Sequence, residues 1–302
     1  MYIETIKGKI AAESLGRTYI HEHLKVDLSS HKKDDDTNFD DIQSVIEEMK
    51  ILKSKGIDGI VEVTNRGMGR DISAMKEIAK ASDMNVIAST GFYKEPFLPK
   101  YVYEMDEKSL SNLLIEDIVN GIDGTDIKAH VIGEIGTSKD KFTDPELKVF
   151  KASVLAHHHT NNPISTHTTL GTMAIEQLDF FEKNGVNLSK VVIGHLDLNC
   201  DIDYHLKIAD RGSFMAFDTI GKSNYEVDEK RIEHILKLVE RGHLNQIMLS
   251  LDITRKSHLK NRGGIGYSYL IEDFVPRLID AGLKEEQINQ MLIYNPQKFL
   301  GV

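Results

Sequence analysis

Short apolar runs alternate along the chain with longer stretches in which apolar residues recur every three or four positions. The runs, read as β-strands, cover residues 16–27, 59–64, 85–91, 130–135, 163–167, 190–195, 213–219 and 246–252. In residues 42–55, the apolar side chains of Val45, Met49 and Leu52 have helical spacing. Further helices are predicted at residues 71–82, 109–120, 145–160, 172–184, 203–211, 228–241 and from 267 onward. The pattern therefore alternates strands with helices.

This alternation predicts an α/β fold, a single (β/α)8 TIM barrel. Parallel strands need a crossover connection, usually a helix, so every strand presents its C-terminal end at the same rim. A length of 302 residues suits one such domain, spanning residues 1–302. A doubly wound open sheet is the alternative, but it would scatter the ends of strands that a barrel makes neighbours. We expect a metal site at the C-terminal rim of the strands.

The ends of five predicted strands carry side chains that can bind a divalent metal ion. In His21-Glu22-His23 the strand alternation turns both imidazoles to one face, away from the glutamate. The later strands that end in such a group carry Glu134, His167, His195 and Asp252. A closed barrel would bring these groups to one place.

Imidazoles and carboxylates suit Zn²⁺, Mn²⁺, Fe²⁺ or Co²⁺. Six ligands are more than one tetrahedral ion needs, so we expect two ions. The histidines of the first strand and Asp252 would hold one ion, and His167 and His195 the other, with Glu134 as the bridge. Two cations would generate a bridging hydroxide as nucleophile, with Asp252 as its general base.

Charge and composition exclude several other partners. The net charge of −10 leaves no excess of basic residues for nucleic acid or an anionic membrane. No apolar run is long enough to span a membrane, and the N-terminus has no signal-like apolar core. The one cysteine, Cys200, cannot form an internal disulfide, so a cytoplasmic location is expected. The sequence leaves homodimer formation open.

Five segments that contain the candidate metal ligands form a set of motifs. The segments are His21-Glu-His23-Leu, Gly133-Glu134-Ile-Gly, Ser165-Thr-His167, Gly194-His195-Leu-Asp and Leu251-Asp252-Ile-Thr-Arg255. This set resembles the phosphotriesterase family of the amidohydrolase superfamily over nearly the whole chain. The resemblance implies a zinc-dependent barrel hydrolase with the same ligands. Many members bridge their metals with a carboxylated lysine, whereas this chain has Glu134 there, as the homology-protein branch of the family does.

Substrate contacts are also suggested at the rim. Lactonases of the family place a tyrosine near the leaving group, and Tyr93 resembles that residue. The basic side chains expected to form a pocket for a phosphate or carboxylate group are Arg66, Lys222, Arg255 and Lys256.

We therefore expect hydrolysis of a small carboxylic ester or lactone, with phosphorylated lactones among the candidates. One alternative is a TatD-like metal-dependent deoxyribonuclease or phosphodiesterase, whose strand-eight motif differs from Asp-Ile-Thr-Arg. Another is a barrel that binds a metal or ligand without catalysis.

Overall fold

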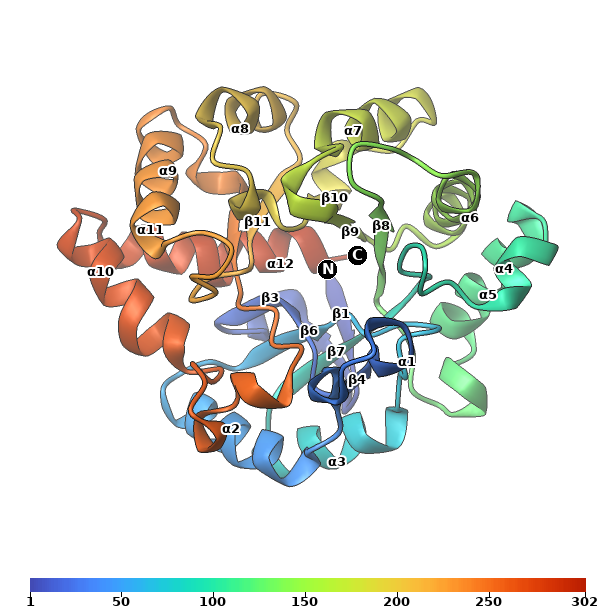
Figure 1. Cartoon of the computed structure of the whole chain (residues 1–302), viewed down its shortest axis with the longest axis horizontal. Helices are drawn as coiled ribbons and strands as arrows, with labels where there is room; N and C mark the ends of the chain where they lie inside the picture. Colours follow the sequence, from blue (N-terminus) through green and yellow to red (C-terminus); the bar gives the residue numbers. More distant parts are fainter.

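The computed structural model describes all 302 residues, and its centre is a sheet of eight parallel strands arranged as a near-closed barrel (Figure 1). The strands are β3 (Thr18–Glu22), β6 (Gly59–Glu62), β7 (Asn85–Thr90), β8 (Val131–Thr137), β9 (Ile164–Thr168), β10 (Val191–Ile193), β11 (Phe214–Phe217) and β12 (Ile247–Leu249). Each is hydrogen-bonded to the next in chain order, from β3 to β12. The predicted fold class is therefore confirmed.

The seam between β12 and β3 is closed by side chains rather than by a backbone ladder. The Ser250 hydroxyl, just after β12, accepts a hydrogen bond from the His21 amide at 3.1 Å. The same oxygen lies 2.8 Å from the His21 carbonyl oxygen. The first and last strands are thus joined beside the first predicted metal ligand.

Helices surround the barrel (Figure 1). The longer ones are α2 (Ile42–Ser54), α3 (Ile72–Ser82), α5 (Glu107–Val119), α6 (Asp144–Thr160), α7 (Ala174–Lys183), α8 (Ile202–Ala209) and α9 (Asp228–Glu240). The shorter ones are α1 (Ser29–Lys32), α4 (Lys100–Glu104), α10 (Val275–Asp280), α11 (Glu285–Asn289) and α12 (Asn295–Leu300). No helix combines the length and apolar content needed to cross a membrane.

Two details differ from the sequence prediction. The single helix expected from residue 267 onward is divided, with π-helical turns at Leu270–Phe274 and Gln290–Tyr294 preceding α10 and α12. Strands β10 and β12 also stop before the ends of their apolar runs. His195 and Asp252 have left-handed backbone angles, φ 58° and 53°, which cannot continue a strand.

Additional strands appear outside the barrel. The hairpin of β1 (Tyr2–Thr5) and β2 (Gly8–Ala11) precedes the barrel, and β4 (Val26–Asp27) pairs with β5 (Asn38–Phe39). The N- and C-termini lie close together (Figure 1), and the amide of Tyr2 donates to the carbonyl of Val302. Ile3 and Phe299 join the barrel's interior cluster, so both chain ends close the face opposite the predicted site.

Candidate metal centre

The six side chains expected to bind metal converge at the C-terminal rim. Donor atoms of His21, His23 and Asp252 all lie within 4.8 Å of one another. Those of Glu134, His167 and His195 form a second group by the same measure. Two clusters of three ligand groups fit a binuclear metal site, as the sequence analysis expected.

Glu134, at the centre of β8, connects the two clusters. Its Oε1 lies 3.4 Å from His23 Nε2, and its Oε2 lies 3.2 Å from His167 Nδ1 and 3.6 Å from His21 Nε2. Burial alone would raise the pKa of Glu134, but the surrounding imidazoles hold that pKa well below its ordinary value. The carboxylate is therefore ionised and contacts both groups, as a bridging ligand must.

Four buried atoms in this centre lack hydrogen-bond partners within the protein. They are both ring nitrogens of His21, Glu134 Oε2 and Asp218 Oδ2. A buried polar atom without a partner costs about 1 to 3 kcal/mol, whereas a bound cation would satisfy His21 Nε2 and Glu134 Oε2 at once. The donor set contains only imidazole nitrogens and carboxylate oxygens. The residues present therefore fit a pair of divalent ions.

Glycines allow strand β9 to pass close to two of the ligand-bearing segments. A Cβ added to Gly133 would lie 2.2 Å from the Ser165 carbonyl, and one at Gly194 would lie 2.3 Å from the Thr166 carbonyl. Only glycine fits where another backbone approaches so closely. The glycines that precede Glu134 and His195 therefore let both of these residues lie close to the backbone of β9 at the rim of the barrel.

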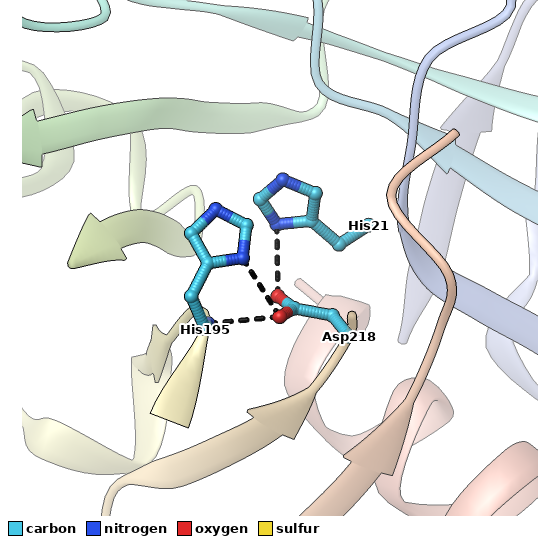
Figure 2. A group of neighbouring side chains, drawn as sticks. All are labelled: His21, His195 and Asp218. Atoms are coloured by element: carbon cyan, nitrogen blue, oxygen red, sulfur yellow. Dashed lines mark hydrogen bonds and ion pairs between the residues drawn. The ribbon is translucent and has the colours of Figure 1, made fainter. Parts of the chain in front are cut away.

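Asp218, just after β11, is an acidic residue of this centre that sequence reasoning missed (Figure 2). Its carboxylate lies 2.8 Å from His195 Nδ1 and 3.3 Å from His21 Nδ1, and it also accepts from the His195 amide at 2.9 Å. A ligand histidine usually donates its second ring N–H to such an acceptor, which fixes the tautomer. The hydrogen bond to His195 Nδ1 therefore leaves Nε2 of that ring free for a metal, and the same carboxylate faces Nδ1 of His21.

The other two histidines have hydroxyl partners. His23 Nδ1 lies 2.7 Å from the Thr64 hydroxyl, which leaves Nε2 directed at Glu134 and Asp252. His167 Nε2 lies 3.3 Å from the Thr169 hydroxyl, which leaves Nδ1 directed at Glu134. All four imidazoles are thus oriented by a second contact.

Replacing Asp218 with asparagine should weaken metal binding. The asparagine amide can satisfy at most one of the two imidazole N–H groups, so one ring loses its orientation. We expect metal affinity to fall by about 10- to 100-fold, measured by competition with a chromophoric chelator. Asp201→Asn, which alters a surface cap of α8, is the control and should bind metal normally. Unchanged affinity in Asp218→Asn would show that the carboxylate does not orient the ligands.

Asp252 is paired with Lys222. The lysine Nζ lies 2.5 Å from Asp252 Oδ2 and also contacts the Asp252 carbonyl, while Asp252 Oδ1 lies 3.3 Å from His23 Nε2. Burial would raise the pKa of Asp252, but Lys222 and the imidazoles of His23 and His195 hold that pKa well below its ordinary value. Lys222 therefore acts on Asp252 and is not a free cation for substrate.

A cavity of about 460 Å³ opens onto the centre. Lys222 and Arg255 line it as expected, and so does Tyr93, whose hydroxyl lies 3.3 Å from His167 Nδ1. The other two basic residues expected near the substrate, Arg66 and Lys256, do not line this cavity. Both are held by carboxylates of other elements: Arg66 pairs with Asp117 of α5, and Lys256 pairs with Asp40, each at 2.7 Å.

The cavity is also lined by basic residues that are not at the predicted strand ends. Lys32, Lys94 and His258 all line it, and neither lysine has an ion-pair partner. Arg255, in contrast, is held by Asp34 at 2.6 Å. This ion pair joins residues more than 200 positions apart in the sequence, so no local motif predicts it.

Together, the parallel barrel and the two ligand clusters at its rim define a metal-dependent hydrolase of the barrel type. Residues 1–300 match the model of the Phosphotriesterase family, and the chain belongs to this family. It is 45% identical over 284 residues to the phosphotriesterase homology protein of Escherichia coli, covering 94% of this chain and 97% of that protein.

Solved structures agree with this assignment. A crystal structure of the E. coli homology protein, with phosphate in its active site, has a TM-score of 0.93 at 44% identity, covering 95% of this chain and 99% of that one. A lactonase from Listeria monocytogenes has a TM-score of 0.95 at 31% identity, covering 99% of both chains. By sequence, the chain is also 33% identical to an aryldialkylphosphatase from Saccharolobus solfataricus, over 97% of both proteins.

Proposed function

We propose that this protein hydrolyses small carboxylic esters or lactones with the help of two divalent metal ions, which we propose to be Zn²⁺. The observation that carries the proposal is that Glu134, Asp252 and Tyr93 all face one cavity beside the two ligand clusters. The similarity to a lactonase over the full chain supports the same reaction class.

The chain's own residues would hold the ions as the clusters suggest. The two histidines of β3 and Asp252 would bind one ion, His167 and His195 the other, and Glu134 both. Bound ions would lower the pKa of a water molecule and polarise the carbonyl of the substrate. The absence of thiolates from the ligand set suits Zn²⁺, Mn²⁺, Fe²⁺ or Co²⁺ at a catalytic rather than a structural site.

Proton transfer falls to Asp252 in this proposal. Its carboxylate is ionised and faces the cavity, so it can accept the proton of the attacking water and pass it to the leaving alkoxide. Lys222 fixes the second oxygen of that carboxylate. Burial and the nearby carboxylates raise the pKa of Tyr93 well above its ordinary value, so its phenol stays protonated and can donate to the leaving oxygen.

An anionic group on the substrate is the second part of the proposal. Lys32, Arg255 and His258 line the cavity together with Asp252, which favours a lactone that carries a phosphate group. The phosphate in the active site of the E. coli relative supports this choice. Lys32 is the clearest candidate, because Arg255 already contacts Asp34.

A substrate screen with the zinc-loaded protein tests the proposal. We expect turnover of simple lactones and aryl esters, faster turnover of phosphorylated lactones, and none of single-stranded DNA. Cleavage of DNA would favour the TatD-like nuclease instead. Metal binding without turnover of any ester would favour a non-catalytic barrel.

The phosphate contact is tested by Lys32→Gln. We expect KM for a phosphorylated lactone to rise about tenfold, because one charge-assisted hydrogen bond is lost, while KM for the unphosphorylated lactone stays unchanged. Lys33→Gln is the matched control, because its side chain is exposed and does not line the cavity. Equal kinetics for the two variants would rule out Lys32 as a phosphate ligand.

A further inference from the structure

Glu22 lies in the His-Glu-His motif but points away from the metal centre, into the seam between β3 and β12. Its side chain has no exposed surface. Oε1 accepts hydrogen bonds from the Ser250 hydroxyl and the Leu251 amide, both at 2.7 Å. Oε2 accepts from the Ile253 amide at 3.0 Å. Both carboxylate oxygens are therefore used to hold the segment after β12.

The two amides that Glu22 binds lie on either side of Asp252. Asp252 has a left-handed backbone, φ 53°, which costs a residue other than glycine of the order of 1 kcal/mol or more. Such a conformation persists only where the surroundings fix it. In this structure the Glu22 carboxylate fixes the chain immediately before and after the strained residue.

The strained conformation decides where the Asp252 carboxylate points. In this conformation Asp252 Oδ1 lies 3.3 Å from His23 Nε2 and 3.8 Å from His21 Nε2. A strand in this position would instead continue the alternation of β12. Loss of the two amide contacts should therefore let the carboxylate move away from the imidazoles.

We propose that Glu22 is a positioning residue that orients Asp252 toward the metal centre by holding the amides of Leu251 and Ile253. The His-Glu-His segment then has two functions. His21 and His23 supply ligands on one face of β3, and Glu22 positions Asp252 from the other face. The inference rests on the proposed role of Asp252 as a metal ligand and proton acceptor.

Glu22→Gln is the test variant. Glutamine has the same shape but only one acceptor oxygen, and its NH2 group would face a backbone N–H. We expect a folded protein in which kcat for the best ester falls about 10- to 100-fold, with KM close to the wild-type value. The visible absorption bands of the Co²⁺-loaded protein should change, because they report the coordination geometry of the ion and need no substrate.

Glu48→Gln is the matched control. Glu48 of α2 is also buried and also accepts from two backbone amides, those of Lys260 at 2.7 Å and Tyr267 at 2.8 Å. Neither amide adjoins a proposed metal ligand. This variant should lose thermal stability as Glu22→Gln does, but keep the wild-type Co²⁺ spectrum and kcat. Glu22→Asp, which retains both oxygens on a shorter arm, provides a second test if Glu22→Gln does not fold.

The outcomes separate a positioning role from a structural one. A changed Co²⁺ spectrum with lowered kcat in either Glu22 variant, set against a normal Glu48→Gln, supports the proposal. A wild-type spectrum and kcat with only a lowered melting temperature would overturn it, as would failure of both Glu22 variants to fold. If the wild-type protein hydrolyses no ester, the proposed function fails, while the spectra still decide whether Glu22 positions Asp252.

Discussion

Asp252→Asn is expected to lower kcat for ester hydrolysis by about a hundredfold or more while the protein still binds its metals. Asparagine keeps an oxygen that can contact the metal centre, but its amide cannot accept a proton at neutral pH. The variant also loses the charge that pairs with Lys222. Steady-state kinetics on the best lactone, with metal content measured on the same sample, checks the expectation.

The control for this experiment is Asp280→Asn. Asp280 ends α10, is exposed and takes part in no ion pair, so its loss of charge should leave kcat unchanged. Turnover by Asp252→Asn at the wild-type rate, with full metal content, would exclude Asp252 as the general base. A fall in kcat that merely follows a fall in metal content would assign Asp252 to metal binding alone.

Removal of the metals should abolish turnover and destabilise the fold. A ligand present at a thousand times its Kd stabilises the folded state by about 4 kcal/mol, and chelation takes this contribution away. We therefore expect dialysis against a chelator to reduce hydrolysis to the background rate and to lower the melting temperature. Added Zn²⁺, Mn²⁺ or Co²⁺ should restore both, and the ion that restores the highest kcat identifies the preferred metal.

Glu134→Gln is the matched variant for the chelation experiment. It removes the carboxylate that contacts both clusters, so the variant should bind metal weakly and its melting temperature should respond little to chelator. A wild-type response in this variant would show that Glu134 is not a shared ligand. An unchanged melting temperature on chelation of the wild-type protein would count against a resident metal pair.

Several features of the protein could be predicted from the sequence because they depend on local pattern and simple topology. Strand alternation puts His21 and His23 on one face, and crossover connections put every strand end at one rim. The convergence of Glu134 on the histidines follows from these two rules, and the structure shows it. Strand lengths were less well predicted, because the predicted runs include His195 and Asp252, whose left-handed backbones cannot belong to a strand.

The positions of the basic side chains near the strand ends could not be predicted from the sequence. Arg66 and Arg255 were both expected to contact the substrate, but Arg66 is held by Asp117 outside the cavity, whereas Arg255 lines the cavity beside Asp34. The tertiary structure decides which carboxylate lies close enough to form an ion pair with each of these two arginines. That choice depends on contacts between distant segments, which local spacing does not contain.

The sequence by itself determined the barrel, the rim and the set of six candidate metal ligands, since all three follow from periodicity and the direction of parallel strands. Only the tertiary structure decided what orients those groups. Asp218 reaches two imidazoles, and Glu22 reaches across the seam to the amides around Asp252. Such hydrogen bonds form between strands that the closed barrel brings together, so their partners are fixed by packing and not by position along the chain.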